Sequence, residues 1–319
     1  MNPKYQNFGF VRMIRLEIIH IFAAVKNLEQ IISPIVPELA QFEAFFKQTL
    51  KAETEPMDSI MRYMHESKGK RLRPILVLLS AKLFGDVNAQ TLRAATFVEM
   101  VHSATLIHDD VVDDSDLRRS HASVKAQFGN LSAVLAGDYL LAKAMLLIAN
   151  DTDIMNEMLR TTMAMSEGEL MQNQAFEGMS FLTEDVRLEM LCIRRSQSTP
   201  SKSAQTPIDS HRNDMGIWAD YLDIITRKTA LLMRSCCVAG AMSVNATPEQ
   251  IQKIADFGLN FGILFQLCDD IIDNENMEQA KSLLPIYYEK TLKALEGFPP
   301  SEITGSLRDL TMFCAVLQH

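Results

Sequence analysis

ATLIHDDVVDDSDLRR, residues 104–119, is the stretch that decides the fold of this chain. It places Asp109 beside Asp110 at the end of an apolar segment with helical spacing, and Asp113 follows one turn later. Asp109 and Asp113 would therefore share one helix face, where unpaired like charges repel each other and destabilise the helix. Carboxylate oxygens are ligands that suit a hard divalent cation. The stretch predicts a long helix that ends in a cation site.

The same spacing returns far along the chain. In FQLCDDIID, residues 265–273, Asp269, Asp270 and Asp273 again close an apolar helical segment. One such cluster would be weak evidence, because a charged helix end is usually solvated. Two facing clusters could hold several Mg²⁺ ions, each with one or two carboxylates and with water or phosphate oxygens in its other positions. The pair therefore predicts magnesium sites that bind a diphosphate group.

The rest of the chain has the same helical character. Only 13 Gly and 11 Pro punctuate its 319 residues, and between them apolar residues recur at three- and four-residue spacing. With 47% hydrophobic residues the chain can bury one large core, so we predict a single all-α domain over residues 1–319, a bundle of mostly antiparallel helices. The expected helices cover residues 35–52, 56–66, 73–84, 88–114, 131–149, 152–176, 216–242, 248–274 and 276–295.

Composition narrows the class of protein further. A net charge of −9 without a basic run argues against nucleic acid as a partner. Five cysteines without metal-type spacing, in a chain that lacks a signal-peptide pattern, favour a cytoplasmic setting. The apolar residues 18–25 are too few for a transmembrane segment, which needs about 20. We expect residues 1–30 to be an N-terminal extension, and residues 194–215, rich in Ser, Thr, Pro and Gln, to be a flexible surface loop.

Basic residues stand on both sides of the first acidic cluster. GKRLRP, residues 69–74, has Pro at what reads as a helix start, and Arg118 and Arg119 follow within about two turns of Asp113. Guanidinium groups and helix N-termini both suit phosphate oxygens. Basic residues at a helix start are more often solvated, so it is their place beside the acidic clusters that indicates diphosphate binding.

Six motifs together carry a family resemblance. In chain order they are GKRLRP, DDVVDDSDLRR, GDYLLAKA, SEGELMQ, RKTALL and FQLCDDIID. The chain resembles trans-polyprenyl diphosphate synthases of the type I isoprenoid synthase fold, over roughly residues 30–180 and 216–275, and is most similar to the bacterial octaprenyl type. The resemblance implies helices around a central cavity, usually in a homodimer. It also implies prenyltransferase activity: head-to-tail condensation of isopentenyl diphosphate with a geranyl, farnesyl or geranylgeranyl diphosphate.

The resemblance also assigns roles to single residues. Arg118 would contact the allylic diphosphate, and Gln172 would lie near the first metal cluster. Lys70, Arg73, His102 and Arg119 match the positions that hold isopentenyl diphosphate, and Lys228, Thr229 and Gln266 match catalytic positions beside the reacting carbons. The magnesium ligands would be Asp109, Asp110, Asp113, Asp269, Asp270 and Asp273. Without the resemblance, His102 would be read as a core histidine, and the polar residues at 228, 229 and 266 as ordinary helix residues.

The mechanism that follows needs no protein nucleophile. Metal and guanidinium groups would stabilise the departing allylic diphosphate, and the isopentenyl double bond would attack the resulting cation. Because Ala104 and Thr105 are small, the cavity below the first cluster should admit a medium or long product, with Met100 and Phe97 as candidate floors.

One segment departs from the family pattern. After Asp273 the usual glycine-rich, lysine-bearing segment is missing, and Lys281 lies near the expected offset of that lysine. A catalytically impaired homologue that serves as a regulatory subunit is therefore the alternative. A terpene cyclase is disfavoured, because it would not need the isopentenyl site.

Overall fold

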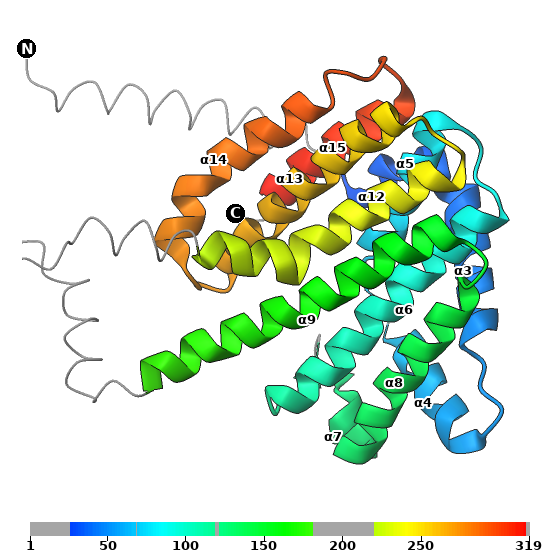
Figure 1. The fold of residues 1–319 in the computed structure, drawn as a ribbon, viewed down its shortest axis with the longest axis vertical. Helices are drawn as coiled ribbons and strands as arrows, with labels where there is room; N and C mark the ends of the chain where they lie inside the picture. Colours follow the sequence, from blue (N-terminus) through cyan, green and yellow to red (C-terminus); the bar gives the residue numbers. More distant parts are fainter. Residues whose placement is uncertain (1–25, 68, 119–120, 181–219, 317–319) are drawn as a thin grey trace, which may run out of the picture.

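The structure is a computed structural model that describes residues 26–67, 69–118, 121–180 and 220–316. These residues form an all-α bundle with one two-residue hairpin, in which Leu117–Arg118 (β1) pairs antiparallel with His121–Ala122 (β2) (Figure 1). The helices are α2 (Leu28–Ile31), η2 (Ser33–Ile35), α3 (Val36–Leu50), α4 (Glu55–Glu66), α5 (Leu72–Phe84), α6 (Ala89–Val112), α7 (Val124–Phe128), α8 (Asn130–Leu147), α9 (Thr152–Ser180), η3 (Thr226–Ala230), α12 (Leu231–Ser243), α13 (Pro248–Ile272), α14 (Met277–Ala294) and α15 (Glu302–Val316).

The predicted all-α class is confirmed, and local chemistry explains where the two acidic helices begin. Asn88 starts α6 by accepting the backbone N–H groups of Gln90 and Thr91, and the Thr91 hydroxyl accepts the Asn88 N–H in return. Thr247 starts α13 with the same type of capping box, and Pro248 takes the first helical position. The periodicity did not predict α2, α7 and α15, because the first two are very short and the third follows a Pro-rich connection.

Helix α12 lies at the centre of the bundle and packs against α5, α6, α9 and α13 (Figure 1). Its residues from Ser235 to Ala241 are all buried. A β-carbon at Gly240 would lie 2.3 Å from the carbonyl oxygen of Val77, so only glycine allows α12 to approach α5 this closely. This contact connects the C-terminal half of the chain to the helix that starts with the GKRLRP motif.

The segment predicted as one helix over residues 216–242 contains a change of winding. Residues 220–225 are α-helical, Thr226–Ala230 form one π-helical turn, and α12 follows. Such turns often occur at functional sites, because they shift side chains relative to a regular helix. The turn contacts α9 at Gly168 and α13 at Gly262, where β-carbons would lie 2.8 Å from Arg227 Cβ and 2.5 Å from Ala230 Cα. Three helices of the site therefore meet at this turn.

Two of the sequence predictions concern the N-terminal extension and the surface loop. Helix α2 begins at Leu28, inside the expected extension 1–30, and Ile31 is buried against the C-terminal helix, where Ser306 Oγ donates to its carbonyl oxygen at 2.7 Å. The remainder of the extension, residues 1–25, and the expected loop 194–215 lie outside the described residues. The shortened C-terminal part of the chain folds into α14 and α15 on this same core.

Candidate active site

The two acidic clusters stand at helix ends with the same backbone geometry. Asp113 and Asp273 both close their helices at φ −82° and ψ 0°. The next residues, Asp114 and Asn274, both adopt left-handed backbone angles, with φ of 52° and 58°. Helix C-termini carry partial negative charge, which adds to that of the carboxylates and favours a cation. The repeated spacing in the sequence therefore corresponds to a repeated structure.

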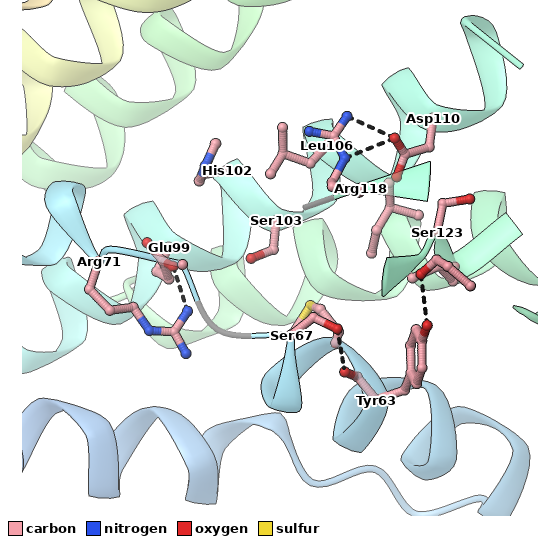
Figure 2. A pocket seen from close by; sticks show the side chains of 15 residues that line it. Tyr63, Ser67, Arg71, Glu99, His102, Ser103, Leu106, Asp110, Arg118 and Ser123 are labelled. Atoms are coloured by element: carbon pink, nitrogen blue, oxygen red, sulfur yellow. Dashed lines mark hydrogen bonds and ion pairs between the residues drawn. The ribbon is translucent and has the colours of Figure 1, made fainter. Parts of the chain in front are cut away.

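The middle aspartate of each cluster is buried and bonded to other protein groups. Arg118 donates from Nε and Nη2 to Oδ1 of Asp110, at 2.8 and 2.7 Å (Figure 2). Tyr221 donates its hydroxyl to Oδ2 of Asp270 at 2.5 Å, and Gln266 donates its amide to Oδ1 at 2.8 Å. Asp110 thus keeps one oxygen without a partner among the described residues, whereas both oxygens of Asp270 accept a hydrogen bond.

The first aspartate of each cluster has no hydrogen bond or ion pair to another described residue. Burial, with the charge of Glu169 nearby, raises the pKa of Asp109 to about 6. Burial, with the charges of Asp273 and Asp270 nearby, raises the pKa of Asp269 to about 6 as well. Carboxyl groups that are partly desolvated and make no direct ion pair are suited to a bound cation.

The carboxylates do not by themselves enclose a metal ion. Among the described residues, no three His, Cys, Asp or Glu side chains lie close enough together to hold a metal. A cation here would need ligands from water or from a bound anion. Mg²⁺ usually binds in this way, through one or two carboxylates together with substrate phosphate oxygens and water. The residues present fit Mg²⁺ bound together with a diphosphate.

Lys228 links the two clusters electrostatically. Its charge lowers the pKa of both Asp109 and Asp270, so it lies within reach of both helix ends. Its ammonium group donates to Gln172 Oε1 at 3.0 Å and pairs with Glu169 Oε2 at 2.7 Å, both on α9. The π-helical turn therefore carries a positive charge that acts on both clusters.

The neighbours of Lys228 on the turn and on α13 extend the network. Thr229 donates its hydroxyl to Gln266 Oε1 at 2.7 Å, and Gln266 in turn donates to Asp270. The structure thus connects the three residues that the resemblance assigned beside the reacting carbons with the one assigned near the first metal cluster: Lys228, Thr229 and Gln266 with Gln172.

A cavity of about 610 Å³ lies beside the second cluster. Lys70, Arg73, His102 and Asp269 line it together, and Arg73 Nη1 lies 2.9 Å from His102 Nε2. Three of the four residues predicted to hold isopentenyl diphosphate therefore share one cavity. The fourth, Arg119, lies outside the described residues. Aromatic and aliphatic side chains from α13 and α15 form the remaining walls: Phe261, Phe265, Ile272, Leu310 and Phe313.

Comparison with known proteins identifies this arrangement. Residues 54–282 match the polyprenyl synthetase family, which is well over half of the chain. The chain belongs to the polyprenyl synthetase family. It is 32% identical over 253 residues to the all-trans-nonaprenyl-diphosphate synthase (geranyl-diphosphate specific) of Rhodobacter capsulatus, which covers 78% of this chain and 67% of that protein. It is 28% identical over 256 residues to octaprenyl diphosphate synthase of Escherichia coli, which covers 79% of this chain and 68% of that one.

Solved structures agree on the fold. A polyprenyl synthase from Caulobacter crescentus, complexed with calcium and isoprenyl diphosphate, superposes with a TM-score of 0.72 at 22% identity and covers 92% of this chain. The match spans about two thirds of the length of the curated relatives, between 64% and 68% for the first three. The resemblance drawn from the six motifs and the prenyltransferase class that it implied are confirmed.

The polyprenyl synthetase site also contains residues that sequence reasoning missed. Glu169 pairs with Lys228, and its position inside the SEGELMQ motif was a usable signal. Tyr221 gave no signal, because it lies outside the six motifs, between Asp220 and Leu222. Lys125 was also missed, although its side chain is only 5% exposed and pairs with Asp114 and, at 3.3 Å, with Asp116. Because both carboxylates pair with Lys125, Asp114 and Asp116 are less available to bind a cation than the aspartates of the first cluster.

Lys281 does not take the place of the lysine that the family segment would supply. It is exposed on α14, and its ammonium group contacts the sulfur of Met277, at 2.8 Å, one turn earlier on the same helix. It is a solvated helix residue. The connection from α13 to α14 spans only residues 273–276, so the second cluster lies at a tight helical turn.

Proposed function

We propose that this protein is a magnesium-dependent trans-polyprenyl diphosphate synthase. It would condense isopentenyl diphosphate head to tail with an allylic diphosphate such as geranyl, farnesyl or geranylgeranyl diphosphate. One observation carries the proposal: near the ends of two similar helices, Asp109 and Asp269 have no hydrogen bond or ion pair to another described residue, and Lys228 acts electrostatically on both clusters. The cavity lined by Lys70, Arg73 and His102 lies next to Asp269 and supplies a second anion site.

The metal ligands of this proposal are not all equivalent. Asp109, Asp113, Asp269 and Asp273 make no side-chain hydrogen bond to another described residue, and we assign them to direct coordination. Asp110 would coordinate through its second oxygen, while Asp270 would have to exchange a bond to Tyr221 or Gln266. When bound, Mg²⁺ would neutralise the diphosphate and make it a better leaving group.

The protein side chains supply the remaining steps. Lys228, oriented by Glu169 and Gln172, would hold the allylic diphosphate between the clusters and stabilise it as the carbon–oxygen bond breaks. Lys70 and Arg73 would hold isopentenyl diphosphate so that its double bond attacks the allylic cation. The proton lost from the new chain would pass to the departed diphosphate, so no protein base is required. Apolar cavity walls would keep water from the cation.

The product is proposed to be of medium or long chain length. Ala104, one residue before the small Thr105, is fully buried below the first cluster, and it offers no bulky side chain to stop a growing tail. The Rhodobacter and Escherichia relatives are named as nonaprenyl and octaprenyl synthases, which supports the same range. Met100 and Phe97 lie deeper on α6, and their role as floors stays a prediction.

We also propose a homodimer that forms on helix α8. Leu131, Leu135 and Leu146 lie along one side of this helix and are 75%, 52% and 77% exposed. Among the described residues, α8 is also the one helix long and apolar enough to suit a membrane, with 28% of its length buried. A large exposed apolar helix face marks an interaction surface. In a symmetric dimer, the same face of a second copy would bury it. Cysteines without disulfides are usual in the cytoplasm, and none of the four described cysteines forms a disulfide with another described residue, which supports the proposed cytoplasmic setting.

Light scattering on the purified protein tests the dimer. Leu135→Glu should shift the protein to the monomer mass, whereas Ile286→Glu, at a similarly exposed apolar residue on α14, should leave the mass unchanged. A dimer that survives Leu135→Glu together with Leu146→Glu would place the interface elsewhere.

The activity itself is tested with labelled isopentenyl diphosphate, Mg²⁺ and each of the three allylic diphosphates, followed by separation of products by chain length. We expect elongated products that disappear on addition of EDTA and return with excess Mg²⁺. Asp269→Asn should abolish them, whereas Asp256→Asn, an exposed residue on the same helix, should not. Binding of the starters without elongation would instead support the impaired regulatory homologue.

A further inference from the structure

The middle arginine of the GKRLRP motif has no role in the function proposed above. Lys70, Arg71 and Arg73 all line the cavity beside the second cluster, but the Arg71 guanidinium group is also bonded to Glu43 on α3 and Glu99 on α6. Its side chain is 10% exposed, and it is bonded to two acidic residues that the sequence did not single out. The question is therefore what this largely buried arginine does between Lys70 and Arg73, the two residues proposed to bind phosphate.

The guanidinium group of Arg71 is held from three sides. Nε donates to Glu43 Oε1 on α3 at 2.9 Å, and Nη1 donates to Glu99 Oε1 on α6 at 2.6 Å (Figure 2 shows the bond to Glu99). The guanidinium carbon lies 4.9 Å from the centre of the Phe46 ring. Glu99 is only 7% exposed and Glu43 26% exposed, so this is a largely buried ion cluster, and it fixes the position of the Arg71 side chain.

The backbone of Arg71 is equally distinctive. It has φ 53° and ψ 31°, in the left-handed region that a non-glycine residue rarely adopts, and it stands immediately before α5. Its carbonyl oxygen accepts the Ile75 N–H at 3.0 Å, the first hydrogen bond of that helix. Such a conformation persists only when the surroundings stabilise it. The bonds to Glu43 and Glu99 are the interactions that do so here.

The same cluster ties the basic loop to the helix that carries the first metal site. Glu99 and His102 lie on one turn of α6, so α6 contacts the loop twice: Glu99 bonds Arg71, and His102 lies 2.9 Å from Arg73. Asp109 follows on the same helix, about 15 Å from Glu99 along its axis at the usual rise per residue. The spacing between the isopentenyl site and the first cluster is thus set by a single rigid element.

We propose that Arg71 is a positioning residue, which with Glu43 and Glu99 holds Lys70 and Arg73 in place to bind isopentenyl diphosphate. The inference rests on the proposed function for the identity of that ligand. The competing possibility is direct binding, because Nη2 of Arg71 is buried and has no hydrogen bond to a described residue. The two possibilities differ in the expected role of Glu43. If Arg71 positions its neighbours, the bond from Arg71 to Glu43 is needed for substrate binding. If Arg71 binds the diphosphate directly, that bond only restrains its side chain.

Steady-state kinetics on Arg71→Met, Arg71→Lys and Glu43→Gln separate these possibilities. A positioning role predicts that KM for isopentenyl diphosphate rises about tenfold in Arg71→Met, since a buried pair has lost one partner. The KM for isopentenyl diphosphate should also rise in Glu43→Gln. Arg71→Lys should restore little of the wild-type KM, because lysine cannot bond two carboxylates through a planar guanidinium group. In all three variants KM for the allylic substrate should stay within about twofold. The control is Arg93→Met, which removes an ion pair with Asp151 near the start of α6 and should alter neither KM.

Hydrogen exchange at the Ile75 amide provides a readout that does not depend on turnover. It should accelerate in Arg71→Met and in Glu43→Gln, but not in Arg93→Met. Unchanged exchange, or an unchanged or lower KM for isopentenyl diphosphate in Glu43→Gln, would overturn the positioning role and leave direct binding. If the wild-type protein elongates nothing, the proposed function fails. Ile75 exchange and calorimetric binding of isopentenyl diphosphate in the same variants would still decide what Arg71 does.

Discussion

The hydroxyl group of Tyr221 should control the second acidic cluster, and its removal gives a sharp test of the site. Tyr221→Phe deletes one oxygen from a residue that is 9% exposed and otherwise keeps its packing against α13. Asp270, which is 5% exposed, would then keep only the bond from Gln266. A buried carboxylate that loses one of two donors should lower the stability of the fold.

The size of the effect follows from the bond that is lost. A hydrogen bond to a charged group contributes about 1.5–3 kcal/mol, and the Tyr221 bond to Asp270 is short, at 2.5 Å. We therefore expect a loss of about 2 kcal/mol in the free energy of unfolding, or roughly 3–6 °C in melting temperature.

The sign of the pH dependence follows from Asp270. Burial raises its pKa, while the bonds from Tyr221 and Gln266 lower it, and burial has the larger effect. Since the phenol bond favours the ionised carboxylate, the difference between Tyr221→Phe and the wild type should be full at pH 8. It should shrink as pH falls through the pKa of Asp270.

The assay is urea unfolding of metal-free protein between pH 5 and pH 8, with the Mg²⁺ concentration needed for half-maximal activity as a second readout. Tyr287→Phe is the matched control, because its partly buried hydroxyl makes no hydrogen bond to a described residue, and it should change stability by less than about 0.5 kcal/mol. Equal stability of Tyr221→Phe and the wild type at pH 8, or a loss that does not vary with pH, would refute the reasoning.

The remaining predictions concern the clusters and their supports. Asp109→Asn and Asp269→Asn should each lower turnover by orders of magnitude with helical content unchanged by circular dichroism; normal turnover in both would sink the metal assignment. Because both carboxyl pKa values lie at about 6 without metal, their ionisation weakens the folded state as pH rises. EDTA should therefore lower the melting temperature more at pH 8 than at pH 5.5, and a loss independent of pH would contradict this. Gly168→Ala places a β-carbon 2.8 Å from η3 and should cost about 1–3 kcal/mol and most of the turnover. Gly305→Ala, with nothing within 4 Å, should do neither. Lys125→Met frees two aspartates next to Arg118 and should raise KM for the allylic substrate, which steady-state kinetics would show.

The sequence by itself determined the fold class and most of the candidate ligands. The spacing of Asp109, Asp110 and Asp113 fixes their order along a helix end wherever that helix lies, because helical geometry is local. The same applies to the second cluster and to the basic GKRLRP motif, whose Lys70 and Arg73 share one cavity. The resemblance then supplied Lys228 and Gln266, which periodicity alone would have left as ordinary polar residues.

Only the tertiary structure decided which partners each of these residues has. Asp110 and Asp270 stand at the same place in their motifs, yet one is bonded by Arg118 and the other by Tyr221 and Gln266. Lys70, Arg71 and Arg73 line the same cavity, and only the carboxylates of α3 and α6, bonded to Arg71, distinguish it from the other two. Hydrogen-bond partners, burial and the charge of a carboxyl group depend on helices far apart in the chain. A motif specifies which groups are available, and packing selects which of them remain free to bind.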